Sequence, residues 1–373
     1  MKKTFLYRAK INKNTEHNCN QWLYLCRSLY NLSLEQRINA YKKNKKSMFA
    51  YDQINMLPAF KKKFPEFKAV GSQCLQEVIE RLDRAYQAFF RRIKQGKKPG
   101  FPRFKSGNRY NSFTLKQNGW KVEGKYLHIR NIGKLKLFLS RPIEGNIKTV
   151  TVCRKHAGKW FVFFSCDNVP ARKAPATDKE IGIDVGIKHF LVDSEGGSVE
   201  NPQYFRRSER LLRRRQRSLS RKKRGSVRRG DARLLVAKAH EKMGNQRKDF
   251  LHKLANKYIE RFKTIFIEDL NIRGMVKNRH LSKSISDSSW GMFFGILSCK
   301  AAEAGRTVIK VAPHGTSQIC SGCGKKVPKS LSVRIHKCPF CGLVLDRDLN
   351  ASLNILAAGQ AAQAPTPALA DVA

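Results

Sequence analysis

The segment VIKVAPHGTSQICSGCGKK occupies residues 308–326, and KCPFCGLVLDRDLNASLNIL occupies residues 337–356. Each segment contains one Cys-x-x-Cys pair, and 14 residues separate the two pairs. This spacing is typical of a zinc ribbon, in which four thiolates bind one structural Zn²⁺ and leave no position open for catalysis. The predicted ligands are Cys320, Cys323, Cys338 and Cys341.

An acidic residue follows the second pair and stands at the start of a predicted helix. Asp348 precedes LNASLNIL, whose leucines recur at helical spacing. Upstream, the apolar stretch IGID ends in Asp184, TIFIE ends in Glu268, and a third strand is expected at 307–312. Acids at strand ends and at a helix start have the placement of an RNase H-type fold. Their hard oxygens would bind two Mg²⁺, one activating water and one stabilising the leaving 3′ oxygen.

Two neighbouring acids compete for these roles. Asp346 lies two residues before Asp348, and Asp269 directly follows Glu268. We favour Asp348 because it immediately precedes the helical pattern, and Glu268 because it immediately follows the apolar TIFI stretch. Asp346 and Asp269 are assigned to capping or outer roles.

The charge of the chain predicts a polyanionic partner. Lys and Arg total 75 against 28 Asp and Glu, a formal net charge of +47, and 41% of the 373 residues are hydrophobic. This balance suits nucleic acid better than a membrane patch or a small acidic ligand. The patterned core and the acids argue against a ribosomal or histone-like protein. No signal peptide or membrane-length apolar run is visible, and the other six cysteines lack a disulfide framework, so we expect a cytoplasmic protein.

Hydrophobic periodicity predicts strands and helices in the first half of the chain. Alternation of apolar and polar residues indicates a strand at 4–11. Apolar residues at helical spacing indicate a long amphipathic helix at 72–95. Four further strands are expected at 125–130, 135–139, 148–153 and 160–166, and with the first strand they would form a small barrel. A second helix is predicted from one apolar face made by Trp22, Leu25, Cys26, Leu29 and Leu32.

Several motifs together resemble the TnpB family of transposon-encoded RNA-guided DNA nucleases, which is ancestral to type V CRISPR effectors. The resemblance covers nearly everything up to Leu356, and none of the three acidic positions is substituted. The motifs are GIDVG, QRKDFLHKLA, IEDL, SISDSSWG, SQICSGCG and CPFCGLVLDRDLNASLNI, with AYQAFFRR and PGFPRFKS in the N-terminal half.

The resemblance implies a multidomain protein of α+β and α/β class. Its parts would be a wedge-type β-barrel with a helical recognition insertion, and an RNase H-like (RuvC) nuclease domain with an inserted zinc ribbon. The implied boundaries are 1–15 and 108–170 for the wedge, 16–107 for recognition, 171–180 for a linker, 181–312 and 343–358 for the nuclease, 313–342 for the zinc-finger target-nucleic-acid-binding insertion, and 359–373 for a disordered tail.

The function implied is RNA-guided cleavage of DNA. Such a protein binds a guide RNA from its transposon end, recognises a short target-adjacent motif, opens double-stranded DNA and holds the displaced single strand. In a prokaryotic cell it would be nucleoid-associated when bound to DNA. A nuclease-inactive repressor and a strand-transferring transposase are the alternatives.

Candidate nucleic-acid contacts come from side-chain chemistry and from the resemblance. Gln73 and Gln76 could pair with adenine, Tyr51 could pack on a thymine methyl, and Thr114 is a further candidate. The block Arg206–Arg229 holds thirteen Lys or Arg residues and one acid, so it would repel itself without a polyanion. Its predicted contact residues are Arg213, Arg214, Arg215, Arg221, Lys222, Lys223 and Arg224.

Overall fold

The computed structural model describes residues 1–330 and 333–363, and it divides into two compact units. The first is Met1–Pro170, and the second begins at Ala171, the first residue of the predicted linker. This linker is not free of the second unit, because Arg172 donates to Glu260 at 2.6 Å and Thr177 donates to the carbonyl oxygen of Arg261 at 3.2 Å.

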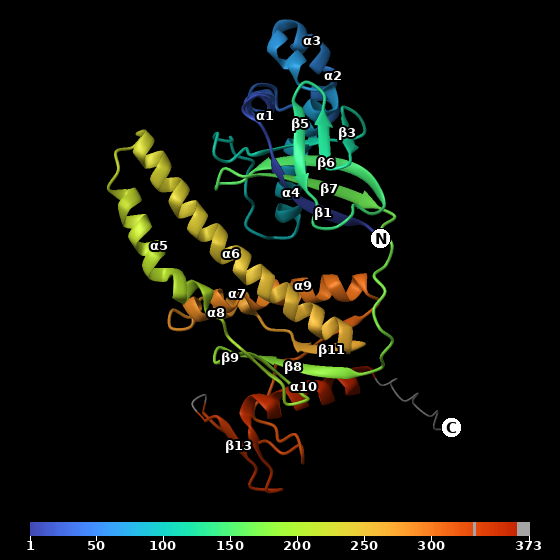
Figure 1. The fold of residues 1–373 in the computed structure, drawn as a ribbon, viewed down its shortest axis with the longest axis vertical. Coiled ribbons are helices and arrows are strands. Elements are labelled where there is room, and N and C mark those ends of the chain that lie inside the picture. The colour runs from blue at the N-terminus through green and yellow to red at the C-terminus, as the bar shows by residue number, and fades with distance from the viewer. Residues whose placement is uncertain (331–332, 364–373) are drawn as a thin grey trace. The chain divides into compact units, whose positions relative to one another are not determined.

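The first unit contains a seven-stranded antiparallel sheet in the order β2-β6-β7-β1-β5-β4-β3 (Figure 1). The N-terminal strand pairs with β7 on one side and β5 on the other, so it joins the later strands as the sequence predicted. The sequence predicted a small barrel, and the structure has an open sheet of which β2 and β3 are the two ends. The strands are β1 (Lys3–Lys10), β2 (Ser112–Leu115), β3 (Trp120–Glu123), β4 (Tyr126–Ile129), β5 (Gly133–Phe138), β6 (Asn146–Arg154) and β7 (Trp160–Asp167).

The chain between β1 and β2 contains two long helices, α1 (Lys13–Asn44) and α4 (Ser72–Lys94), which pack against each other. The buried Arg37 joins them through an ion pair with Asp83 at 2.9 Å. Four of the five predicted apolar positions of α1 are buried, but Leu32 is 44% exposed. The buried stripe advances by 3.6 residues per turn, so Ser33 faces inward in its place. Shorter elements between the helices are α2 (Ala50–Asn55), α3 (Leu57–Lys63) and the 3₁₀ helix η1 (Pro65–Ala69).

The second unit is built on a five-stranded mixed sheet in the order β10-β9-β8-β11-β12. β8 (Glu180–Val185), β11 (Thr264–Glu268) and β12 (Thr307–Val311) are parallel to one another. β9 (His189–Asp193) is antiparallel to β8, and β10 (Ser198–Glu200) is antiparallel to β9. The crossovers between the parallel strands contain α6 (Val227–Arg261) and α9 (Trp290–Glu303). Parallel strands connected in this way carry their carboxyl ends to one edge of the sheet.

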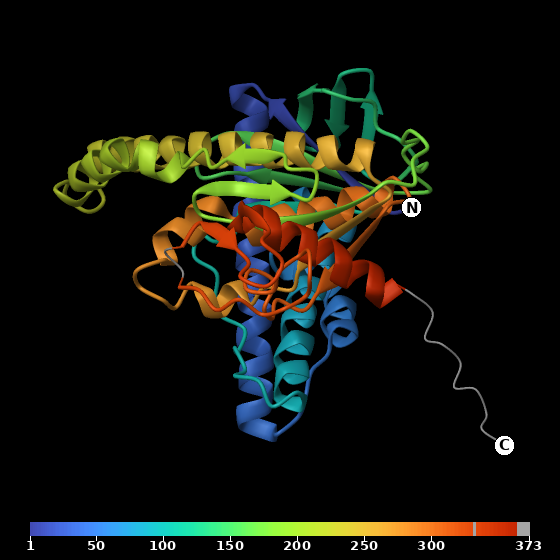
Figure 2. The ribbon, with the colours of Figure 1, turned by 90° about the horizontal axis from the view of Figure 1, so that it is seen from below.

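Helix α10 (Arg347–Gln363) packs on the face of this sheet opposite α6 and α9 (Figures 1 and 2). Two glycines allow the close approach. A Cβ on Gly182 of β8 would lie 2.2 Å from the carbonyl oxygen of Ser352, and one on Gly359 would lie 2.0 Å from the ring of Phe266. Gly359 was predicted to begin a disordered tail, but the helix continues to Gln363. The remaining tail, 364–373, lies outside the described residues.

The second unit also carries two projections. Helix α5 (Tyr204–Ser220) and the first half of α6 form a helical hairpin that extends beyond the sheet (Figure 2). β13 (Ile335–Lys337) and β14 (Val344–Asp346) form a two-stranded ribbon next to the cysteine pairs. Two short helices, α7 (Ile272–Met275) and α8 (Ser282–Ser288), complete the unit. Within residues 1–330 and 333–363, no helix combines the length and apolar content that crossing a bilayer requires.

Candidate acidic site and four-cysteine cluster

The three predicted acids belong to three elements that meet at one edge of the sheet. Asp184 lies near the end of β8, Glu268 is the last residue of β11, and Asp348 is in the first turn of α10. β8 and β11 are in parallel register with Ile183 opposite Ile267, so Asp184 and Glu268 are the next residues along the two strands. A Cβ on Gly186 would lie 3.9 Å from Oδ2 of Asp348, which puts that carboxylate beside the turn after β8.

Electrostatic interactions link the three carboxylates. Burial raises the pKa of Asp184 well above its usual value, and the negative charges of Glu268 and Asp348 raise it further. Burial also raises the pKa of Glu268, although Thr316 opposes this by donating a 2.6 Å hydrogen bond to Oε1. Like charges held together in this way disfavour ionisation unless a cation is added. The donor set therefore fits hard divalent cations, which prefer carboxylate oxygens.

Two arginines already hold Asp348. Nε and an Nη of Arg347 donate to Oδ1 at 3.1 and 3.0 Å, and a guanidinium nitrogen of Arg334 lies 3.9 Å from Oδ2. Charge-assisted bonds of this kind fix a side chain more firmly than neutral ones. Asp348 is therefore held in place at the start of α10, and it is 8% exposed.

The two competing acids have other partners. Oδ1 of Asp346 accepts hydrogen bonds from the backbone N–H groups of Asp348 at 2.8 Å and Leu349 at 3.4 Å, which is the geometry of a helix N-cap. Asp269 is exposed and forms an ion pair with Lys310 at 2.8 Å. The hydrogen bonds of Asp346 agree with the capping role that the sequence assigned to it.

Replacing Asp184 with asparagine should stabilise the protein in Mg²⁺-free buffer. Its pKa is raised in the folded state, so the fold gains stability as the pH falls through that pKa and loses it as the carboxylate ionises. The gain from Asp184→Asn should therefore be present at pH 8 and shrink towards pH 4. Each kcal/mol relieved should raise Tm by about 2–4 °C. Thermal unfolding at several pH values measures this, and Asp269→Asn, at an exposed ion pair, should give no such gain.

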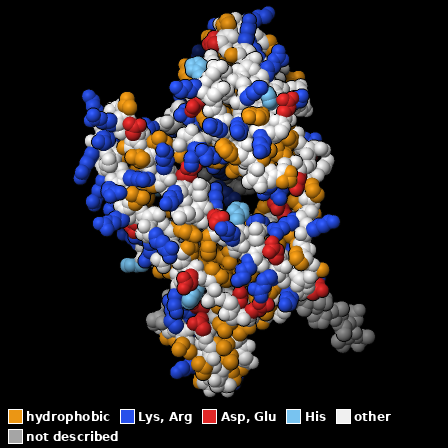
Figure 3. Space-filling view, viewed as in Figure 1, with side chains coloured by type: hydrophobic (Ala, Val, Ile, Leu, Met, Phe, Trp, Pro, Cys, Tyr) orange, Lys and Arg blue, Asp and Glu red, His pale blue; other side chains and the backbone are white. Residues whose placement is uncertain are grey.

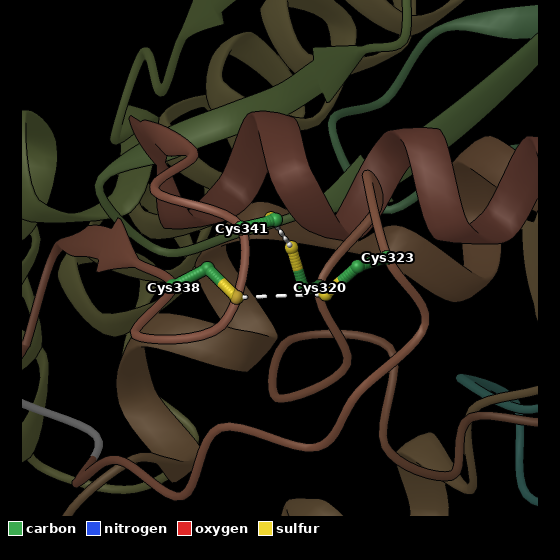
Figure 4. A group of neighbouring side chains, drawn as sticks. All are labelled: Cys320, Cys323, Cys338 and Cys341. Carbon is green, nitrogen blue, oxygen red and sulfur yellow. Dashed lines mark hydrogen bonds between the residues drawn. The ribbon is translucent and has the colours of Figure 1, made fainter.

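The four cysteines form one compact group. Their sulfur atoms all lie within 4.8 Å of one another, and Sγ–Sγ separations are 3.6 Å for Cys320–Cys341 and 3.6 Å for Cys323–Cys338 (Figure 4). Tetrahedral Zn²⁺ with Zn–S bonds of about 2.3 Å places sulfurs about 3.8 Å apart, so the group fits this ion. Among the described residues this is the one cluster of that tightness, and the three carboxylates are more widely spaced.

The thiol of Cys338 is set up as a metal ligand. Burial acts to raise the pKa of this thiol, but hydrogen bonds from the backbone N–H groups of Cys341 and Phe340, together with those from the thiols of Cys341 and Cys320, lower the pKa to about 6. The thiolate is the form that binds metal.

Helix α10 connects the cysteine cluster to the acids. Asn350, which is fully buried, accepts from the backbone N–H of Ser321 at 3.0 Å and donates to the carbonyl oxygen of Ile319 at 2.7 Å. Asn354 donates to the carbonyl oxygens of Thr316 and Ile319, both at 2.7 Å. The loop that carries Cys320 is thus bonded to the helix that carries Asp348. Sequence reasoning missed these two asparagines, and their i, i+4 spacing in NASLN was the available signal.

The predicted base-reading residues lie in the first unit, and they differ in exposure and in how many hydrogen bonds already hold them. Tyr51 on α2 is 74% exposed, and Gln76 on α4 is half-buried. Oε1 of Gln73 accepts from the backbone N–H groups of Gln117 at 3.1 Å and Asn118 at 3.2 Å, so both of its lone pairs are used. Bidentate pairing of Gln73 with adenine would therefore require the release of this loop contact. Thr114 is held between the hydroxyl of Thr151 at 2.9 Å and Arg81.

The basic block covers most of α5, the turn after it and the start of α6, and Figure 3 shows Lys and Arg side chains gathered along the hairpin. Arg215 donates to the carbonyl oxygen of Leu235 at 2.9 Å and ties α5 to α6, whereas Arg213 pairs with Glu209 at 3.2 Å. Most of the predicted contact residues are exposed, namely Arg213, Arg214, Arg221, Lys223 and Arg224, with Lys222 half-buried. The hairpin therefore presents a positive surface to solvent.

Comparison with known proteins gives three family matches along the chain. Residues 149–279 match a family described as "Probable transposase" (OrfB_IS605), and residues 290–355 match the "Cas12f1-like, TNB domain". A protein of Streptomyces pristinaespiralis named "Putative RNA-guided DNA endonuclease" is 34% identical over 98% of this chain and 91% of its own length. The chain belongs to the TnpB family.

Other relatives of this TnpB-family protein extend the same likeness. "Putative RNA-guided DNA endonuclease InsQ" of Escherichia coli (strain K12) is 28% identical over 97% of this chain and 94% of its own. A solved structure titled as the mini-RNA-guided endonuclease CRISPR-Cas_phi3 shares the fold, with a TM-score of 0.51 and 10% identity. The match covers 96% of this chain and 92% of that one. Residues 1–46 match a "Helix-turn-helix domain", but here they form β1 and one continuous helix, α1.

Proposed function

We propose that this protein is an RNA-guided DNA endonuclease. It binds a guide RNA derived from its transposon end, recognises a short motif beside the target, opens double-stranded DNA and cleaves it by two-metal hydrolysis. The observation that carries the proposal is the meeting of Asp184, Glu268 and Asp348 at one edge of the parallel strands, with the pKa of Asp184 raised by burial and by the other two. The names of the relatives in Streptomyces and Escherichia coli support it.

The proposed nuclease unit is RuvC-like, and its own residues prepare the site for cations. Asp184, Glu268 and Asp348 would hold two Mg²⁺, which supply water activation and stabilisation of the leaving 3′ oxygen when bound. Thr316 orients the Glu268 carboxylate through its hydrogen bond, and Arg347 with Arg334 orients that of Asp348. Pre-organised ligands reduce the cost of assembling the site at the moment of reaction.

The proposed division of labour assigns sequence reading mainly to base pairing. Guide RNA, target duplex and displaced strand would lie against the positive surface, to which the α5–α6 hairpin contributes. Tyr51, Gln76 and Thr114 are proposed to contact the target-adjacent motif. One structural Zn²⁺ at the four cysteines would hold the loop that is bonded to Asn350 and Asn354.

Two other functions are weighed against this one. A nuclease-inactive repressor would not need three intact carboxylates, and a strand-transferring transposase would need transposon-end DNA. Incubation of the purified complex with a target plasmid separates the three. A linear product without transposon-end DNA supports the endonuclease, binding without cutting supports the repressor, and a requirement for transposon ends supports the transposase.

We expect the protein to purify with RNA. A formal net charge of +47 on one chain is strongly self-repelling, and a bound polyanion relieves it. The ratio of absorbance at 260 and 280 nm measures the bound nucleic acid, and nuclease treatment identifies it as RNA. A preparation free of nucleic acid that still cleaves its target in full would contradict this expectation.

A further inference from the structure

An aromatic cluster lies exposed at the C-terminal end of α4 and in the loop that follows it. The ring of Phe101 meets those of Tyr86 and Phe89 edge to face, with centroids 5.5 and 5.3 Å apart, and Phe90 contacts the same two rings at 6.4 and 5.1 Å. Phe90 is 54% exposed and Phe101 48%. We call Tyr86, Phe89, Phe90 and Phe101 the aromatic platform. Large rings left in solvent in this way mark a binding surface more often than chance.

The platform is surrounded by positive charge. Residues 90–109 contain eight Lys or Arg residues and no acid, and in the described part of the chain none of the eight forms an ion pair with a carboxylate. Seven are exposed, and Lys105 is half-buried. The residues are Arg91, Arg92, Lys94, Lys97, Lys98, Arg103, Lys105 and Arg109.

The loop is held in place before any partner arrives. Asn31 of α1 donates to the carbonyl oxygen of Lys105 at 3.0 Å and accepts from its backbone N–H at 2.8 Å. Pro102, between the exposed Phe101 and Phe104, is buried. A surface already ordered loses less conformational entropy when a ligand binds than a mobile loop does.

We propose that the aromatic platform binds unpaired nucleotides of the guide RNA by stacking, with the surrounding lysines and arginines on the phosphates. Exposed rings beside positive charge are what single-stranded nucleic acids require, because every base offers a flat face and every nucleotide a phosphate. A second copy of this chain is excluded as the occupant, because eight unpaired positive charges would face eight others.

The guide RNA fits better than the DNA strands. Bases of duplex DNA are stacked on one another, and the displaced DNA strand has free bases only after the target has been opened, whereas RNA that has not met its target already has free bases. The rings are exposed in the chain on its own. A guide RNA that stays bound throughout the life of the protein would keep them covered, whereas a transient DNA target would leave them exposed most of the time. This inference rests on the proposed function, and it adds a recognition site for that RNA outside the acidic edge.

The test uses full-length protein and the RNA that co-purifies with the wild type, sequenced and transcribed in vitro. In Phe90→Leu/Phe101→Leu the apolar volume is largely kept and the aromatic faces are lost. We expect Kd for the RNA to rise about fivefold or more, since stacking contributes at least that factor per base. The salt dependence of binding should not change, whereas Lys97→Gln/Lys98→Gln should reduce its slope.

The matched control is Phe138→Leu, which changes a ring that is 47% exposed on β5 and outside the platform. It should bind RNA as the wild type does. Ultraviolet cross-linking of the complex should join residues 90–104 to unpaired guide nucleotides.

Unchanged RNA affinity in the Phe90→Leu/Phe101→Leu variant, or cross-links from this segment to DNA alone, would overturn the inference while leaving the endonuclease proposal intact. A wild-type protein that binds no RNA would overturn both. Melting curves of the variants identify any loss of affinity that comes from unfolding, and the cross-linking of the wild-type complex then decides the matter.

Discussion

Single replacement of Asp184, Glu268 or Asp348 by alanine should abolish target cleavage and leave guide and target binding nearly unchanged. Each substitution removes one negative charge from a chain of net charge +47, so nucleic-acid affinity has no reason to fall. Cleavage needs all three ligands, because a displaced Mg²⁺ removes water activation and leaving-group stabilisation together. We expect a loss of about a thousandfold or more, since metal-ion stabilisation of the transition state contributes several kcal/mol.

The controls are the two neighbouring acids. Asp346→Ala removes the cap of α10, which costs about 1 kcal/mol of stability, and Asp269→Ala removes an exposed ion pair. Both variants should keep most of their cleavage activity. Binding and cleavage measured side by side on all five variants give the answer. Cleavage that survives in Asp348→Ala but disappears in Asp346→Ala would show that the third ligand is Asp346.

Replacement of Cys338 by serine should remove zinc and destabilise the second unit. A structural four-thiolate site contributes about 10 kcal/mol or more of binding free energy that exists only in the folded state. The effect should reach the acidic edge, because Asn350 and Asn354 bond the loop of Cys320 to the helix of Asp348. We expect the zinc content to fall from one ion per chain to none, with a lower Tm and loss of cleavage.

The matched control for this prediction is Cys299→Ser, at an exposed cysteine of α9 outside the cluster. That variant should keep one zinc per chain and normal activity. Zinc content is measured by elemental analysis of the purified protein. Active wild-type protein without zinc would rule out the structural role proposed here.

Much of the second unit could be predicted because its signals are local. The strands that end in Asp184 and Glu268 are short apolar runs, and the cysteine spacing is a one-dimensional pattern. Parallel pairing then brings strand ends together whatever the intervening sequence is. The helix beginning at Asp348 was found from its leucines, but its length was not, because its last turns, AAGQAAQ, contain no large apolar side chain that would continue the pattern. Burial of Gly359 against Phe266 extends it to Gln363.

The features that sequence reasoning missed depend on long-range contacts. β2 and β3 alternate polar and apolar residues but have only four residues each, which is a weak signal, and pairing with β6 and β4 stabilises them. An open sheet and a closed barrel share the same strand pattern, so the pattern could not separate them. Gln73 was read as free on the surface of a helix, but it accepts from the backbone of a loop more than forty residues away in sequence. Helical periodicity carries no information on such a partner.

Reprogramming the guide tests the central claim most directly. The complex is assembled with the co-purifying RNA, or with the same RNA whose target-pairing segment has been exchanged, and each is incubated with Mg²⁺ and a plasmid that carries both matching sites beside the same adjacent motif. The account predicts that the cut moves to the site that matches the new guide, and that Asp184→Ala binds this site without cutting. Cleavage that stays at the old site, or that proceeds without RNA, would contradict it.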